Sequence, residues 1–466
     1  MTKAKTLDMT TGPFLKKIIL FSLPIMVSGI LQILFNAADT VIVGQFSIDG
    51  DYAVSAVGST SSLINAIVAL AMGLSNGAGV IVAQNIGAKN KEAVGKTVHT
   101  AMLVAVILGF LLGVIGFFFA GELLKVMDTP AEVLPLASLY TKIYFLGLPV
   151  VLIYNFGSSI LRAIGDTTRP LIFLAISGVL NVGLNLIFVA VFNMSVIGVA
   201  LATVISQAVS AVLVVLYMKK QDNDCRLYFK KLCINKRSFL QMLYIGVPAG
   251  LQGMIFSVSN VIMQSTINTF GPLAMAGSAA ASSVAGFIFI PMNSIHHAST
   301  TFIGQNTGAK KIKQIKKLSI LLNMVVLCIA VIMSVAIVGF GRTLIGLYTD
   351  TPEAVKFGMI HLFVMGAPYF VCGLMDVTVG CIRGMGTSLS PMLVSVFGVC
   401  GIRLIWIWVI FPFIRNSVEN VNMQYFFLFL SYVISWTITL ICQCVIWKTT
   451  YKKLEIKYLQ KEKEQS

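Results

Sequence analysis

Charged residues are scarce in this sequence of 466 residues, of which only 11% are Asp, Glu, Lys or Arg. A soluble domain carries about 25% charged residues, so this scarcity excludes an ordinary soluble protein. Hydrophobic residues instead make up 57% of the chain. The composition therefore predicts an integral membrane protein.

Patterns for catalysis and metal binding are also scarce. Only four histidines occur, none of them in an HExxH pattern, and His296 and His297 have no carboxylate beside them in the sequence. A membrane enzyme would need a nucleophile with a base, or a set of metal ligands. We therefore expect no enzyme activity and no cofactor. His297 lies one helical turn from Asn293, which predicts that it lines a cavity.

Cysteine is absent from the first 224 residues. Cys225 and Cys233 fall in a polar segment, and the other six cysteines fall in apolar segments. This distribution predicts free thiols rather than structural disulfides.

Apolar runs of about 20 residues, enough to cross a bilayer as a helix, recur along the chain. The first is longer than the apolar core of a cleavable signal peptide, so it is predicted to be a membrane helix. We expect an all-α integral membrane protein with about twelve transmembrane helices. The expected spans are 16–46, 53–84, 97–120, 135–160, 168–192, 195–218, 238–269, 273–304, 315–341, 355–382, 389–413 and 423–448.

Basic residues are concentrated on one side of the predicted membrane. If the chain crosses at each span, 28 of the 34 Lys and Arg residues fall on the side of the N-terminus and 4 on the other side. The positive-inside rule then predicts that both termini are cytoplasmic and that the protein lies in the cell membrane. Because no recognition module interrupts the helices, the net charge of +16 indicates topology and anionic lipid, and we expect no nucleic-acid partner.

Two motifs recur about 221 positions apart. Gln-Asn-Ile-Gly-Ala-Lys at 84–89 returns as Gln-Asn-Thr-Gly-Ala-Lys at 305–310, and Arg-x-x-Gly at 162–165 returns at 383–386. Internal symmetry on this scale is typical of secondary transporters. Each half has an even number of spans, which predicts parallel repeats: two six-helix bundles facing each other across a central cavity.

One long polar segment, 219–237, interrupts the apolar runs and carries seven basic residues. We interpret it as a cytoplasmic linker. The predicted domains are an N-lobe at 1–218, this linker, a C-lobe at 238–448 and a basic cytoplasmic tail, helical or coiled, at 449–466.

A polar stripe marks the first predicted helix. Gln32, Asn36 and Asp39 lie on one helix face, and a carboxylate inside a membrane is costly enough to indicate function. On the fifth helix Asn181 and Asn185 are one turn apart, and at about 1.5 Å per residue Asn185 should match Asp39 in depth. Helix packing is the alternative role for the two asparagines. The predicted proton- or ion-coupling site consists of Asp39, Asn36, Asn181 and Asn185.

The second half has a polar stripe without an acidic residue, on the seventh predicted helix, so the two halves are chemically unequal. Asp376 and Arg403 are costly charges within the tenth and eleventh spans. They could form a structural salt bridge, or Asp376 could face a cavity and attract a cationic substrate or carry a proton. The residues predicted to line a substrate cavity are Gln32, Asn155, Gln252, Asn260, Gln264, His297, Asp376 and Arg403.

Taken together, these motifs resemble those of the multidrug and toxic compound extrusion (MATE) family. The resemblance covers about residues 14–448 and is carried by Pro24, by Asp-Thr-Val-Ile-Val-Gly at 39–44, and by the two pairs of repeated loops. It implies a V-shaped pair of six-helix lobes. It also implies efflux of cationic, amphiphilic drugs or toxic organic compounds in exchange for inward protons or sodium ions.

The resemblance is closer to the DinF-like branch than to the NorM-like branch. Asp39 matches a coupling aspartate of the DinF-like branch, and Asn181 matches an asparagine of the same site. Asn185 stands where many DinF-like members have a second aspartate, which leaves H⁺ and Na⁺ open as the coupling ion, with Na⁺ binding at Asp39. The seventh-helix glutamate of NorM-type members is absent, and Phe256 lies at about its position. Asp376 resembles the tenth-helix acid of the family only loosely.

A flippase of lipid-linked saccharides is the alternative within this architecture. Its pyrophosphate-bearing substrate would need a cavity rich in Lys and Arg, whereas Lys142 and Arg403 are the basic residues expected inside the spans. We therefore favour an antiporter of small cationic compounds that works by alternating access. One chain with two lobes suffices for this mechanism, so we expect a monomer.

Overall fold

The computed structural model describes residues 7–127 and 129–465, and residues 1–6, 128 and 466 lie outside this description. Helices dominate the described chain, which contains no β-strand. Within residues 7–127 and 129–465, ten helices are long and apolar enough to cross a membrane, and two bent helix pairs raise the number to twelve if each pair is one span. The predicted all-α membrane architecture is confirmed.

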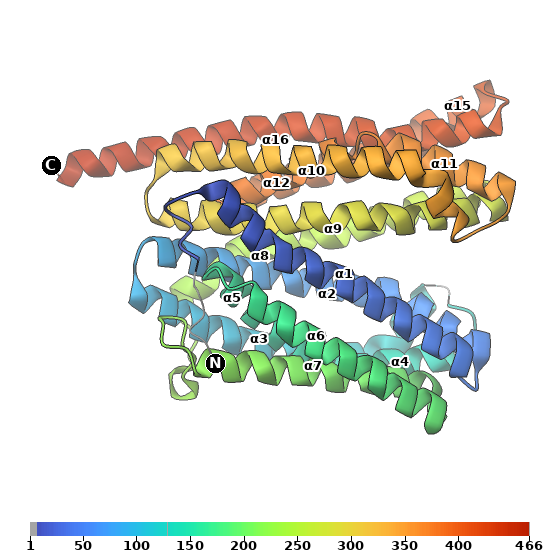
Figure 1. Ribbon diagram of the computed structural model, residues 1–466, viewed down its shortest axis with the longest axis horizontal. Coiled ribbons are helices and arrows are strands. Elements are labelled where there is room, and N and C mark those ends of the chain that lie inside the picture. The colour runs from blue at the N-terminus through green and yellow to red at the C-terminus, as the bar shows by residue number, and fades with distance from the viewer. Residues whose placement is uncertain (1–6, 128, 466) are drawn as a thin grey trace. The chain divides into compact units, whose positions relative to one another are not determined.

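The helices follow the predicted spans in order (Figure 1). In the first half they are α1 (Phe14–Phe46), α2 (Gly50–Gly87), α3 (Lys91–Val126), α4 (Leu134–Leu146), α5 (Leu148–Ala163), α6 (Thr168–Asn185), the π-helix η1 (Leu186–Val191) and α7 (Ser195–Lys219). The short 3₁₀-helix η2 (Phe229–Lys231) lies in the linker.

The second half repeats this order. Its elements are α8 (Lys236–Asn268), α9 (Pro272–Gly308), α10 (Ile312–Gly346), α11 (Pro352–Gly366), α12 (Tyr369–Gly384), α13 (Leu389–Ser395), η3 (Val396–Gly401), α14 (Ile402–Ile405), η4 (Trp406–Ile410), α15 (Phe411–Ser417) and α16 (Val421–Gln465). The predicted tail is helical, because α16 continues through it and extends past the other helices of its half in Figure 1.

Contacts divide the chain into two compact units. One contains Leu23–Gly250 with the segment that ends at Asp8, and the other contains Met9–Ser22 with the chain from Leu251 onward. The division falls inside α1 and α8. The lobe limits at 218 and 238 stay a prediction.

The sequence repeat is also a repeat of backbone geometry. The lysine that ends each Gln-Asn-x-Gly-Ala-Lys loop has a positive φ, 54° at Lys89 and 57° at Lys310. Gly165 and Gly386 close the two Arg-x-x-Gly loops with φ of 91° and 94°, a conformation that only glycine adopts without strain. The same local structure therefore recurs at the same offset as the sequence motifs.

Two of the expected spans are bent. The helices α4 and α5 meet at 50°, and α11 and α12 meet at 44°. Proline lies at each bend, as Pro149 in the first turn of α5 and as Pro368 at the N-cap of α12. A proline lacks the N–H that would continue the preceding helix, which explains the kink. Each of the spans expected at 135–160 and 355–382 thus consists of two helices.

Glycines allow α2 to approach the first part of α8 closely. A Cβ atom at Gly73 would lie 2.2 Å from the backbone nitrogen of Gly250, and one at Gly77 would lie 2.7 Å from a backbone oxygen of α8. Ser75 lies between these glycines in a GxSxG spacing, the pattern of hydrolase nucleophiles. It is in mid-helix, however, and its hydroxyl donates to the carbonyl of Met72, 2.9 Å away. This pattern therefore serves helix packing.

Candidate functional site

The first candidate site lies within the first unit, where α1, α6 and α7 bring polar side chains together. The Asn185 Nδ2 donates to Asp39 Oδ1 at 2.5 Å and is 3.4 Å from Asn181 Oδ1. The Asn181 amide in turn donates to Thr203 Oγ1 at 3.5 Å. The match in depth between Asp39 and Asn185 is confirmed by their contact. The coupling role predicted for these residues stays a prediction.

Burial makes this cluster chemically unusual. Asn185 is fully buried, and Asn181 is 6% exposed. The Asn185 Oδ1 has no hydrogen-bond partner among the described residues. A buried acceptor without a donor is costly. A carboxylate and a free amide oxygen on one asparagine–aspartate pair can together accept a proton or coordinate a hard cation.

The other residues predicted for this half lie outside the cluster. Gln32 and Asn36 are exposed on α1, and the Asn36 carbonyl accepts from the hydroxyl of Thr40 at 3.0 Å. Asn155 is half-buried on α5, and its amide donates to the Val151 carbonyl of its own helix at 2.9 Å. The structure thus brings Asp39, Asn181 and Asn185 together but leaves Asn36 apart from them.

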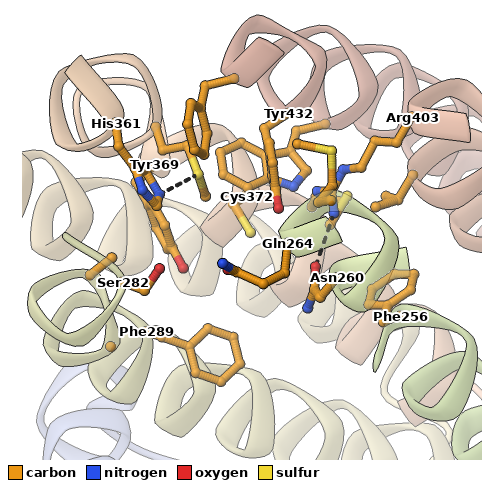
Figure 2. Close-up of a pocket in the computed structure, with 18 of the residues that line it drawn as sticks. Phe256, Asn260, Gln264, Ser282, Phe289, His361, Tyr369, Cys372, Arg403 and Tyr432 are labelled. Carbon is orange, nitrogen blue, oxygen red and sulfur yellow. Dashed lines mark hydrogen bonds between the residues drawn. The ribbon is translucent and has the colours of Figure 1, made fainter. Parts of the chain in front are cut away.

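The second candidate site is a cavity of about 450 Å³ within the second unit. Its walls come from α8, α9, α11, α12, α16 and the span that runs from α13 to α15. Figure 2 shows polar and aromatic side chains pointing into this space from several helices. Four of the residues predicted for a substrate cavity line it: Asn260, Gln264, Asp376 and Arg403.

Asp376 brings a carboxylate to this cavity. It is half-buried on α12, and its carbonyl accepts from His296 Nδ1 at 2.7 Å, which ties α9 to α12. Within the described part of the chain its carboxylate belongs to no ion pair. The guanidinium of Arg383 acts on it electrostatically from the same helix. The cavity therefore contains a carboxylate that a cationic ligand can bind.

Arg403 is fixed by groups other than Asp376. It is 5% exposed, and its guanidinium carbon lies 3.8 Å from the ring centroid of Tyr432. Its Nε donates to Ser435 Oγ at 3.4 Å and its Nη1 to Asn260 Oδ1 at 3.5 Å, the latter drawn in Figure 2. The alternative of a structural salt bridge with Asp376 is wrong, because these hydrogen bonds and the aromatic face hold the guanidinium instead.

Gln252 and His297 do not line this cavity. The Gln252 Oε1 accepts from Arg383 Nη2 at 2.8 Å, so it stabilises a buried arginine. The ring of His297 lies edge-on to that of His296, with centroids 5.8 Å apart. Arg383 was placed in a loop by its motif, but α12 runs to Gly384 and buries it. Arg383 is thus a further buried basic residue, one position beyond the span expected at 355–382.

The aromatic residues of the cavity were not predicted from the sequence. Tyr432 and Trp436 of α16 line it with Tyr369 of α12, and the rings of Tyr369 and Trp436 meet edge-to-face at 5.4 Å. His361 also lines it, with its ring stacked on Phe429 at 4.0 Å. The signal was present, since Phe429, Tyr432 and Trp436 follow each other at intervals of three and four residues on one helix face.

Comparison with known proteins agrees with this architecture. A family model described as MatE matches residues 24–187 and 248–409, one match in each half. Among curated relatives, the chain is 30% identical over 410 residues to a probable multidrug resistance protein, YpnP, of Bacillus subtilis, covering 88% of this chain and 89% of that protein. It is 27% identical over 405 residues to a probable multidrug resistance protein, NorM, of Thermotoga maritima, covering 84% of each.

Solved structures show the same fold. A crystal structure of a MATE transporter in a bent conformation matches with a TM-score of 0.88 at 20% identity, covering 98% of this chain and 99% of the other. A transporter of the MOP superfamily from Pyrococcus furiosus matches with a TM-score of 0.87 at 21% identity, covering 98% and 100%. The chain is thus a multi-pass membrane protein and a transporter rather than an enzyme. It belongs to the MatE family of multidrug efflux transporters.

Proposed function

We propose that this protein exports cationic, amphiphilic small molecules in exchange for inward H⁺ or Na⁺, by alternating access. The observation that carries the proposal is the pair formed by Asp39 and Asn185, a carboxylate and an unpartnered amide oxygen among membrane helices. Two candidate sites of different chemistry, one in each unit, suit a transporter that handles an ion and an organic substrate separately.

The coupling ion binds at Asp39 in this proposal. A protonated Asp39 could donate to the free oxygen of Asn185, and Na⁺ could be coordinated by oxygens of both residues. A buried carboxylate that gains a proton or a cation changes the local charge of α1 and α6 by one unit. Such a change shifts the equilibrium between two conformations of the transporter if the ion binds one of them more tightly than the other.

The cavity of the second unit supports a cationic, amphiphilic substrate. Asp376 supplies the charge, and the rings of Tyr369 and Phe289 supply faces that attract cations and apolar groups. The guanidinium of Arg403 already has partners: it lies over the ring of Tyr432 and donates hydrogen bonds to Ser435 and Asn260. A substrate cation therefore finds its best partner at the Asp376 side of the cavity.

A flippase of lipid-linked saccharides is not favoured. Such a substrate carries pyrophosphate, which is bound by several arginines and lysines together. In the cavity described here Arg403 is the single Lys or Arg side chain, and the acid Asp376 lines the same cavity. The relatives reported above are named as multidrug resistance proteins.

The export proposal is tested with everted membrane vesicles and a pair of fluorescent dyes of similar shape, one cationic and one anionic. Gradient-driven accumulation of the cationic dye alone, under a proton or a sodium gradient applied separately, would support the proposal and identify the ion. Accumulation of the anionic dye in preference, or of neither dye under both gradients, would contradict it.

The linker cysteines test the proposed orientation, with both termini cytoplasmic in the cell membrane. Burial, and next the charge of Asp224, raises the pKa of Cys225 to about 12, so at neutral pH it is a buried thiol with little thiolate. Cys233 is exposed. In single-cysteine variants, an impermeant maleimide should label Cys233 in everted vesicles and leave Cys225 unlabelled in both vesicle orientations. Labelling of Cys233 from the outside of intact cells would contradict the proposed orientation and place the linker outside the cell.

A further inference from the structure

The linker between α7 and α8 is a folded element attached to α3. The Tyr228 N–H donates to His99 Nε2 at 3.1 Å, and the Thr100 hydroxyl donates to the Cys233 carbonyl at 3.1 Å. Leu227 and Cys225 are each 2% exposed, so this polar segment has a small core of its own. The backbone that carries its lysines and arginine is consequently held against α3.

Between the linker and the first turns of α3 lies a cavity of about 630 Å³. Two acidic residues line it, Glu92 and Asp224, and both lie near lysines, at 2.5 Å from Lys96 and 4.0 Å from Lys91 respectively. Five basic residues line it: Lys91, Lys96, Arg226, Lys230 and Lys231. Even after both carboxylates are counted, the lining is strongly positive.

Of the three linker cations that line the cavity, Arg226 lies 4.0 Å from the exposed carboxylate of Asp222. Arg226 and Lys231 both lie over the ring of Tyr228, at 5.1 Å and 4.9 Å from its centroid. Lys230 and Lys231 form no ion pair with any residue that the structure describes. Like charges at this spacing repel each other. Several cations around an open space, on a segment whose backbone is bound to α3, form an arrangement that can bind a phosphate group.

The surroundings indicate the source of the phosphate. The linker begins where α7 ends, at Lys219, and leads into α8 at Lys236, and both helices qualify as membrane spans. The pocket therefore lies at a membrane surface. Phe229 and Ile234 are 53% and 48% exposed, and each is next in the chain to a residue that lines the cavity. Apolar side chains next to a cationic pocket suit a lipid, whose phosphate meets the lysines while its acyl chains meet the apolar residues.

We propose that this pocket binds the phosphate group of an anionic phospholipid. A bound headgroup would stabilise the contact between the linker and α3, and so fix the first turn of α8, where Ser238 and Thr97 already meet at 3.2 Å. The site is separate from the ion and substrate sites and does not depend on the identity of the exported compound. It gives the transporter a dependence on anionic lipid that charge asymmetry alone would not produce.

Binding of phosphatidylglycerol to the purified full-length protein, counted by native mass spectrometry, tests the proposal. The Lys230→Gln/Lys231→Gln pair should weaken this binding about tenfold, because each basic residue near an anionic lipid contributes to its attraction. The matched control is Lys452→Gln/Lys453→Gln, which removes the same charge from exposed positions of α16 and should bind as the wild type does. A Lys230→Arg/Lys231→Arg pair keeps the charge and should retain binding.

Several outcomes would overturn the proposal. Equal losses in the linker pair and the α16 pair would mean that overall charge, and not this pocket, attracts the lipid. Equal binding of phosphatidylcholine would remove the requirement for an anionic headgroup. Competition by inorganic phosphate at concentrations matching those of the lipid would identify a site for free phosphate instead. Loss of binding in the arginine pair as well would show that charge in the pocket is not what holds the lipid.

Discussion

Replacing Asp39 with asparagine is expected to abolish gradient-driven export while leaving the protein folded. The Asn185 amide can donate to a carbonyl oxygen at position 39 as it does to the carboxylate, so the contact between α1 and α6 is kept. What is lost is the group that takes up and releases the ion. Coupling free energies between two bound ligands correspond to factors of about 5 to 150 in affinity, so the ion should change the substrate affinity of the wild type by this order and leave that of the variant unchanged.

The control for this variant is Glu132→Gln, which removes one carboxylate from an exposed position of the turn before α4. It should export as the wild type does. Substrate binding to the detergent-solubilised Asp39→Asn protein should also persist but lose its dependence on pH or Na⁺. Wild-type export by Asp39→Asn under either gradient would refute the assignment of the coupling site to this residue.

Replacing Asp376 with asparagine is expected to weaken binding of cationic substrates by about 30-fold or more, the effect of removing one partner from a buried charge pair. The charge of Arg403 would then stand without an acid in the same cavity and would repel an incoming cation. A neutral substrate analogue of similar shape should bind with unchanged affinity. The measurement is equilibrium binding of both compounds to wild type and variant.

Asp350→Asn is the matched control, since it removes an exposed carboxylate of the same half from the turn between α10 and α11. It should change the affinity for neither compound. If Asp376→Asn weakened binding of the neutral analogue as strongly as that of the cation, the carboxylate would act by shaping the cavity rather than by its charge. If it abolished ion coupling and spared binding, the coupling site would lie in the second half.

The arrangement of Asp39 and Asn185 could be predicted because a helix rises by a fixed amount per residue. Counting from the predicted ends of two helices placed both side chains at one depth, and the structure joins them at 2.5 Å. The same counting could not say which face of α1 packs inward. Asn36 shares the stripe with Asp39 but is exposed, because α1 packs with few of its residues buried.

The cavity of the second unit could be predicted only in part. Charged and amide side chains such as Asp376, Arg403 and Asn260 stand out in an apolar helix because burying them is costly. Aromatic residues such as Tyr432 and Trp436 do not stand out, since lipid, protein core and cavity all accept them. Helix ends were the other weak point: Arg383 was assigned to a loop, and only the course of α12 to Gly384 shows that it is buried.

The most direct test of ion-coupled export uses proteoliposomes without any preset ion gradient. A lipophilic cation is added on one side, and the luminal pH and Na⁺ concentration are followed by fluorescent indicators. For an antiporter, reciprocity requires that the substrate gradient drive H⁺ or Na⁺ in the opposite direction. We expect such a flux in the wild type, reversing when the substrate gradient is reversed, and none in Asp39→Asn. Substrate movement across the bilayer without a flux of either ion would contradict ion-coupled export.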